Sequence, residues 1–137
     1  MPESHTEDMV FPMRESDEKI AEYLKDKNEA AVALFLAFRA AALAAGSDVD
    51  EKVSKTMVAW RVKRTFATAY IKGKYLECSI DLLHPVDHQH LKASFHTTRK
   101  VVTNRFTLEL GEKVDQQIKA WLQEASANVG PGTRSTS

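Results

Sequence analysis

The sequence has very little cysteine, and this excludes one class of protein at once. Cys78 is the single cysteine among 137 residues, so a miniprotein held together by disulfides is excluded. Glycine and proline are also few, which excludes a collagen-like or low-complexity chain. Hydrophobic residues make up 43% of the chain and charged residues 28%. These fractions are typical of one ordinary globular domain.

A long apolar run is missing as well. The longest stretch, residues 30–45, is interrupted by Arg39 and is shorter than the roughly 20 residues that cross a bilayer. The first 16 residues carry charges and no apolar run, which is not the pattern of a signal peptide. With a lone thiol and no export signal, the sequence predicts a cytoplasmic protein with no membrane partner.

Net charge is zero, yet the charges are unevenly distributed along the chain. Residues 1–51 contain 12 acidic and 5 basic side chains, whereas residues 52–105 contain 3 acidic and 11 basic ones. Such asymmetry is one sign of an anion-binding or nucleic-acid-binding surface. The alternative is that the acidic and basic parts neutralise each other within the fold.

Two helices are predicted after a flexible arm formed by residues 1–15. Ser16 suits a helix N-cap, and Ile20, Tyr23 and Leu24 share one helical face before the helix ends near Asn28. Residues 29–45 are rich in alanine and leucine and form the second helix. Its apolar stripe is wide, which indicates burial on more than one side.

Alternating apolar and polar residues predict four antiparallel strands, at residues 56–61, 64–71, 74–82 and 101–110. The first three form a meander, and Lys72-Gly73 has the spacing of a hairpin turn. A last amphipathic helix covers residues 111–125, and residues 127–137 form a flexible tail. The prediction is one α+β domain over residues 16–126, in which the C-terminal helix packs on one face of the sheet.

Three short motifs in the predicted sheet carry a family resemblance: Lys55-Thr56, residues 64–67 (RTFA) and residues 74–77 (KYLE). With the preceding helix and the closing helix, they resemble a small bacterial family of unknown function over residues 29–125. The resemblance implies the fold described above and an association with DNA-modification or restriction-linked modules. It supplies no catalytic residue.

The segment between the third and fourth strands contains a histidine cluster. His84, Asp87, His88 and His90 lie within seven residues, and imidazole and carboxylate groups are good ligands for zinc or nickel. The spacing matches no standard metal site, so His84, His88 and His90 are weak metal candidates. An acid–base role near neutral pH is a second hypothesis for them, and an exposed polar turn is the third.

Other routes to catalysis have less support in the sequence. Cys78 alternates with Leu76 and Ile80, which places it in the core, where a thiol is inert. Glu77 and Asp81 share a strand face but lie about 13 Å apart, too far for a glycosidase pair. No catalytic residue and no cofactor are predicted, and the sequence favours a protein that is not an enzyme.

Basic and aromatic residues alternate along the predicted strands, which suits single-stranded nucleic acid. We expect a binding module that uses the uncovered sheet face, on which Asp81 and Arg105 could meet. The candidate binding residues are Trp60, Arg64, Asp81, His84 and Arg105. The expected ligand is a small molecule or a protein partner. The alternatives are a nucleic-acid accessory domain, a small enzyme or metal site at residues 84–90, and a homodimer formed through a sheet edge.

Overall fold

The structure is a computed structural model that describes residues 14–132. An antiparallel sheet of six strands forms its centre, in the order β1-β2-β3-β4-β6-β5. The strands are Asp50–Val53 (β1), Val58–Arg61 (β2), Thr65–Lys72 (β3), Tyr75–Leu82 (β4), Leu91–His96 (β5) and Val102–Leu108 (β6). The helices are Asp17–Leu24 (α2), Glu29–Leu43 (α3) and Gln116–Asn128 (α4). Most of the arm expected at residues 1–15 lies outside the described residues, as do residues 133–137.

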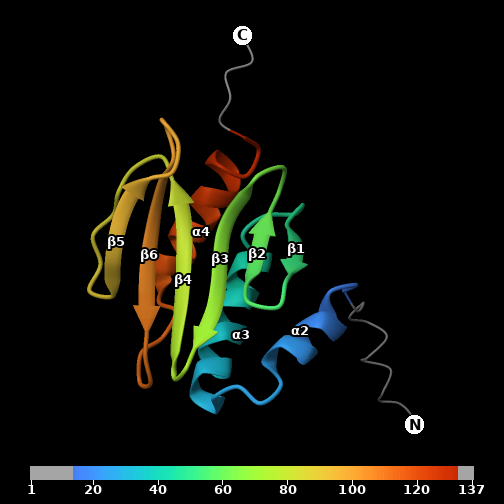
Figure 1. Cartoon of the computed structure of the whole chain (residues 1–137). Helices are drawn as coiled ribbons and strands as arrows, with labels where there is room; N and C mark the ends of the chain where they lie inside the picture. Colours follow the sequence, from blue (N-terminus) through green and yellow to red (C-terminus); the bar gives the residue numbers. More distant parts are fainter. Residues whose placement is uncertain (1–13, 133–137) are drawn as a thin grey trace.

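The predicted α+β architecture is confirmed. Helices α3 and α4 lie behind the sheet in Figure 1, and α2 lies beside the edge that β1 forms. We call the side packed against α3 and α4 the covered face, and the opposite side the open face. None of the described helices combines the length and the hydrophobicity needed to cross a bilayer.

Alternation along the strands decides which side chains reach each face. In β4, Leu76, Cys78, Ile80 and Leu82 are buried on the covered face. The residues between them point to the open face and are only partly buried, because successive side chains in a strand point to opposite sides. The core is therefore a single layer between the sheet and helices α3 and α4.

The number of strands was predicted wrongly, since the sheet has six strands rather than four. β1 was missed because it is short and because its residues, Asp50, Glu51, Lys52 and Val53, are typical of a charged loop. β5 was missed although Leu91, Ala93 and Phe95 alternate with polar residues, because the strand is mostly exposed and lies in the histidine-rich segment that was interpreted as a loop. Both are edge strands, where packing on both faces is weakest and the sequence signal is faint.

Two helix boundaries also differ from expectation. α2 ends at Leu24 rather than near Asn28, and Asp26 adopts a left-handed backbone conformation with φ 64°. α4 begins at Gln116 rather than at Gly111, because Asp115 is its N-cap: the Asp115 carboxylate accepts a hydrogen bond of 2.9 Å from the Ile118 amide.

The C-terminal boundary of the domain lies beyond the predicted one. Helix α4 continues to Asn128, and Val129 is fully buried. The carbonyl of Gly130 then accepts hydrogen bonds from the amides of Lys63 and Arg64, at 2.9 and 2.8 Å. Residues 127–130 of the expected tail are therefore part of the packed domain.

Candidate binding site on the open sheet face

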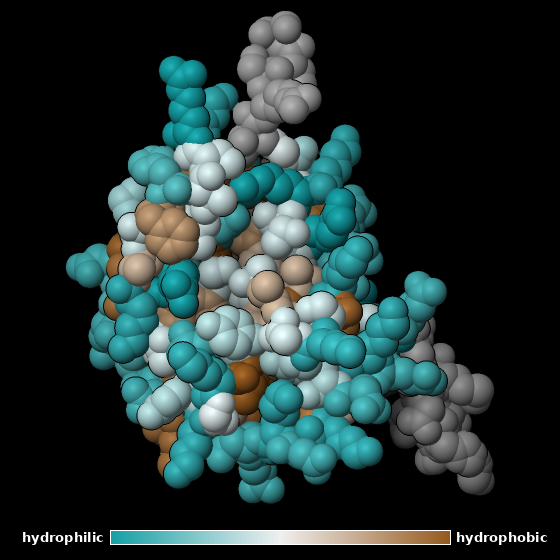
Figure 2. All heavy atoms as spheres, viewed as in Figure 1, coloured by the Kyte–Doolittle hydropathy of each residue, from teal (hydrophilic) through white to brown (hydrophobic). Residues whose placement is uncertain are grey.

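The open face is polar and carries more basic than acidic side chains. Figure 2 views this face and shows mostly teal and pale residues with small brown areas between them. Strand register places on it the side chains of Asp50, Lys52, Ala59, Arg61, Thr68, Tyr70, Lys72, Tyr75, Glu77, Ser79, Asp81, Ala93, Phe95, Thr103, Arg105 and Thr107. No described helix covers them, so the face is accessible to a ligand.

Asp81, Thr103 and Arg64 form a cluster on this face. Thr103 donates a hydrogen bond of 2.8 Å to one Asp81 carboxylate oxygen, and the Arg64 guanidinium lies 3.5 Å from the other. Burial raises the pKa of Asp81, and the Thr103 and Arg64 contacts offset only part of that effect. These two contacts therefore do not fully offset the burial of the Asp81 carboxylate. Most of the N–H donors of the Arg64 guanidinium make no contact with Asp81.

Arg105 lies next to this cluster with its side chain exposed. It faces Ser79 across the β4–β6 ladder, two residues from Thr103, which is about 7 Å along a strand. Among residues 14–132 no carboxylate pairs with it. A shallow hollow of about 170 Å³ lies beside it, lined by Thr68, Tyr70, Glu77, Cys78, Ser79, Thr103 and Arg105. Two guanidinium groups with spare donors, next to hydroxyl groups, suit an anionic ligand.

The expected meeting of Asp81 and Arg105 on the open surface occurs only in part. Both side chains lie on the open face, but the arginine that contacts Asp81 is Arg64. Arg64 is held by the C-terminal turn through the hydrogen bond from its amide to Gly130. A Cβ atom at Gly130 would lie 2.5 Å from the Ser126 carbonyl oxygen and 2.8 Å from a methyl group of Val62. Only glycine allows this close approach, and it was missed because it lies in the expected tail.

Trp60 is not on the open face. Its side chain is fully buried on the covered face, with its ring centroid 6.1 Å from that of Phe35 and 5.5 Å from that of Phe38. The indole N–H donates a hydrogen bond of 2.8 Å to Glu51. The structure therefore separates Trp60 from the other candidate residues and places it in the core under α3.

Each imidazole of the histidine cluster contacts a carboxylate of the α4 region, and His88 and His90 also contact each other, with ring centroids 5.3 Å apart. His84 lies 2.6 Å from Glu124, His88 lies 2.9 Å from Asp115, and the third histidine, His90, lies 3.4 Å from Glu112. His88 is largely buried beside aromatic rings and is a satisfied core histidine. None of these imidazoles lies on the open face.

A shared metal site does not form from these residues. Within residues 14–132, no group of three or more His, Cys, Asp or Glu side chains is arranged to hold a metal ion. Cys78 is buried in the core, and burial raises the pKa of its thiol, so the reactive thiolate form is suppressed.

Comparison with known proteins identifies a family without assigning a chemistry. Residues 20–128 match the family described as a domain of unknown function, DUF5655, and the chain belongs to this family. The matched region includes every strand and all three helices except the first residues of α2. Comparison with curated proteins and with solved structures gave no match.

Proposed function

We propose that this DUF5655 domain is a non-catalytic binding module whose open sheet face receives an anionic ligand. The observation that carries the proposal is the cluster of Arg64, Asp81 and Thr103, next to Arg105, which has no carboxylate partner among residues 14–132. A guanidinium group has five N–H donors in a planar fork. Arg64 shows one ion-pair contact of 3.5 Å, so its donors are available for a phosphate or carboxylate.

Asp81 is the natural competitor of such a ligand. An incoming anion would take over the Arg64 contact, and Asp81 would keep the hydrogen bond from Thr103. The raised pKa of Asp81 supports this exchange, because it shows that the Arg64 contact does not fully offset the burial of the carboxylate. Trp60 and His84 have no part in this proposed site, since both lie away from the open face.

Single-stranded nucleic acid is the second candidate ligand, and the aromatic side chains of the open face favour it. Tyr75 is 43% exposed and Phe95 is 46% exposed, and both are on the face that carries Arg64 and Arg105. Bases stack on exposed aromatic rings while basic residues bind the phosphates. The link to DNA-modification modules and a cytoplasmic location remain predictions.

The hypothesis of an enzyme or metal site at residues 84–90 is not taken further. His84, His88 and His90 each have a different carboxylate partner. An acid–base or metal-binding role requires such groups to converge on one substrate or ion. His88 and His90 contact each other, but within residues 14–132 no group of three or more such side chains is arranged to hold a metal ion.

The proposed site is tested by titrating two probes: tripolyphosphate by calorimetry and a labelled oligonucleotide by fluorescence anisotropy at two salt concentrations. We expect Arg64→Gln together with Arg105→Gln to weaken binding by about 1–3 kcal/mol, and affinity for the oligonucleotide to fall steeply with salt. Lys19→Gln on the exposed surface of α2 is the control and should change nothing. Binding of tripolyphosphate alone would select a small anion. Failure of both probes at low salt would refute the anionic site.

A further inference from the structure

The outward side of α3 carries a row of alanines where a surface helix normally carries charges. The row consists of Ala30, Ala33, Ala37, Ala40 and Ala44, all exposed or half-buried. Glu29 and Arg39 are the two charged residues of this helix, and Arg39 is engaged with Glu51 and Asp17. A helix that is apolar on all sides is normally covered on all sides.

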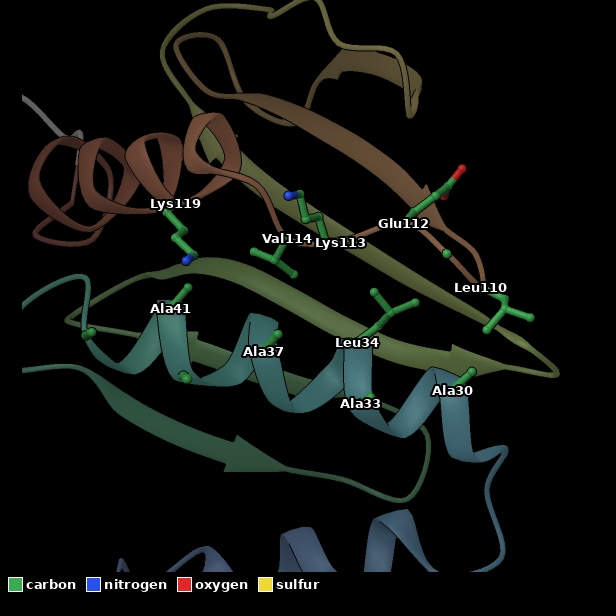
Figure 3. Close-up of a pocket in the computed structure, with 13 residues that line it drawn as sticks. Ala30, Ala33, Leu34, Ala37, Ala41, Leu110, Glu112, Lys113, Val114 and Lys119 are labelled. Atoms are coloured by element: carbon green, nitrogen blue, oxygen red, sulfur yellow. The ribbon is translucent and has the colours of Figure 1, made fainter.

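The alanine row forms one wall of a groove. The groove has a volume of about 700 Å³ and lies between α3 and residues 110–114, which lead into α4. Figure 3 shows Leu34 and Val114 between its walls, with Leu110 at the end near Ala30 and Lys119 at the end near Ala41. Leu110 is 78% exposed, the highest value among the large hydrophobic side chains that the described residues leave in water.

The groove and Leu110 together have the shape of a self-complementary surface. Small side chains on α3 leave room for a partner, and the projecting side chain of Leu110 is large enough to fill such room. A two-fold interface requires the same patch to supply both parts, because each copy presents its patch to the other. A patch with only a hollow or only a projection would fit a different protein better than itself.

We propose that a second copy of this chain docks here, with the two α3 helices antiparallel about a two-fold axis near Ala37. The alanines are spaced alternately by three and four residues, which is the spacing of residues that face a partner helix. Leu110 of each chain then packs against the alanine row of the other chain, across the axis. This interface is independent of the open sheet face, which stays accessible on both copies.

The charges at the two ends of the groove fit the antiparallel arrangement. Glu29 begins α3 at one end and Lys119 lines the groove at the other. A two-fold axis at the centre of α3 brings Glu29 of one chain towards the partner's Lys119, and the reverse on the other side. A parallel arrangement would place like charges together, at Glu29 and again at Lys119, which is unfavourable.

Sedimentation velocity on the full chain tests the interface directly. We expect reversible dimers whose fraction rises over about a hundredfold range of concentration, since a small interface binds weakly. Ala37→Arg should abolish the dimer, because it places two like charges at the axis. Ala21→Arg on the exposed surface of α2 is the matched control and should dimerise like the parent chain. A monomeric parent chain, or a dimer that survives Ala37→Arg, would overturn the proposal.

Thermal melts of the same proteins identify the competing occupant of the groove. If the parent chain is a monomer and Ala37→Arg melts far below Ala21→Arg, the chain fills its own groove, and the dimer is excluded. For a dimer, Ala37→Arg and Ala21→Arg should have the same circular dichroism spectrum, since Ala37 is exposed within one copy. The loss of the dimer is then separated from a loss of folding.

Oxidative cross-linking of single-cysteine variants tests the orientation. Ala37→Cys should form a disulfide-linked dimer, because the two positions meet at the axis. Ala44→Cys should not, since each lies about 10.5 Å from the axis along the helix, and a disulfide needs Cα atoms within about 7 Å. The native Cys78 is buried and does not compete. Cross-linking at Ala44→Cys as efficient as at Ala37→Cys would show a parallel pair and overturn the antiparallel arrangement.

Discussion

Two arginine–carboxylate clusters lie on opposite sides of the sheet, and they differ in how completely they are satisfied. Under the covered face, Arg39 contacts both oxygens of Glu51, at 2.7 and 2.8 Å, and also Asp17 at 2.7 Å. On the open face, Arg64 makes one contact with Asp81 at 3.5 Å. The first pair is bidentate and short, whereas the second is single and long.

The carboxylates differ in the same direction. Glu51 also accepts hydrogen bonds from Ser16 and from the Trp60 indole. Burial alone would raise its pKa, but the hydrogen bonds from Arg39, Ser16 and Trp60 outweigh burial, so the pKa is lowered. At Asp81 burial prevails and the pKa is raised. A cluster whose hydrogen-bonding groups are engaged with one another holds elements together, whereas a cluster with free donors can still bind a ligand. The Arg39 cluster therefore stabilises the fold, whereas the Arg64 cluster has the free donors that the proposed function requires.

The largest effect is expected at Glu51, which would lose its charge in Glu51→Gln. Removing one partner of a buried pair costs about 3–5 kcal/mol when the other charge is left uncompensated. Asp17 still pairs with Arg39, so we expect a loss towards the lower end of that range. Urea denaturation should show this loss in the free energy of unfolding. Replacing both partners, Arg39→Met with Glu51→Met, should cost less than Glu51→Gln alone. A loss below about 1 kcal/mol for Glu51→Gln, the value of an exposed pair, would remove the distinction between the two clusters.

The sequence predicted which residues share a face in β4 and in β6, because the alternation of these strands is regular. It did not predict that Trp60 shares the covered face with Ile80. Trp60 pairs with Ala67, which in turn pairs with Ile80, and such register depends on contacts across the sheet. A register shift also follows Trp60 in the β2–β3 ladder. Local alternation cannot reveal either feature.

The same limit explains which residues of the two clusters could be predicted from the sequence. Arg64, Asp81 and Arg105 were chosen because polar residues within apolar strands are visible in the sequence. Glu51 was not chosen, because a glutamate between Asp50 and Lys52 is typical of a solvated turn. Its side chain is 1% exposed only because Arg39 and Trp60 come from other elements to meet it. Gly130 was hidden for a similar reason, since its partners Lys63 and Arg64 are far away in the sequence.

The second largest effect is expected at Gly130, which connects the fold to the site. In Gly130→Ala the added methyl group would meet the Ser126 carbonyl oxygen and the side chain of Val62, and overpacking of this kind costs about 1–3 kcal/mol. The displaced turn should also weaken tripolyphosphate binding by moving Arg64. Thermal melts and calorimetry measure the two effects. Asn128→Ala, at the exposed last residue of α4, is the control. Unchanged binding in Gly130→Ala would show that the turn does not position Arg64.

A smaller and opposite effect is expected at Asp81. Because burial raises its pKa, the structure disfavours the charged form, and Asp81→Asn should change stability by less than about 1 kcal/mol or increase it. The same substitution frees Arg64 and should strengthen tripolyphosphate binding. In the parent chain, binding should strengthen as the pH falls through the raised pKa of Asp81, and this dependence should vanish in Asp81→Asn. Destabilisation as large as that of Glu51→Gln would make both clusters structural.

The smallest effect is expected at His84, because its pair with Glu124 is exposed to solvent. Its pKa is raised by a hydrogen bond to the Pro85 carbonyl and by the Glu124 carboxylate. A raised folded pKa means that the pair stabilises the fold fully below the ordinary pKa of histidine, and that this contribution disappears as the pH rises through the folded value. The His84 side chain is 48% exposed, so solvent screening keeps the contribution below about 0.5 kcal/mol.

His84→Gln should therefore lower the free energy of unfolding slightly at acidic pH and leave it unchanged at alkaline pH. The measurement is a pair of urea titrations, one on each side of the histidine pKa, with His96→Gln on the exposed strand β5 as the control. If His84→Gln matched Glu51→Gln in magnitude, exposure would not be what separates the clusters, and the assignment of Arg64 and Asp81 to a ligand would lose its physical basis.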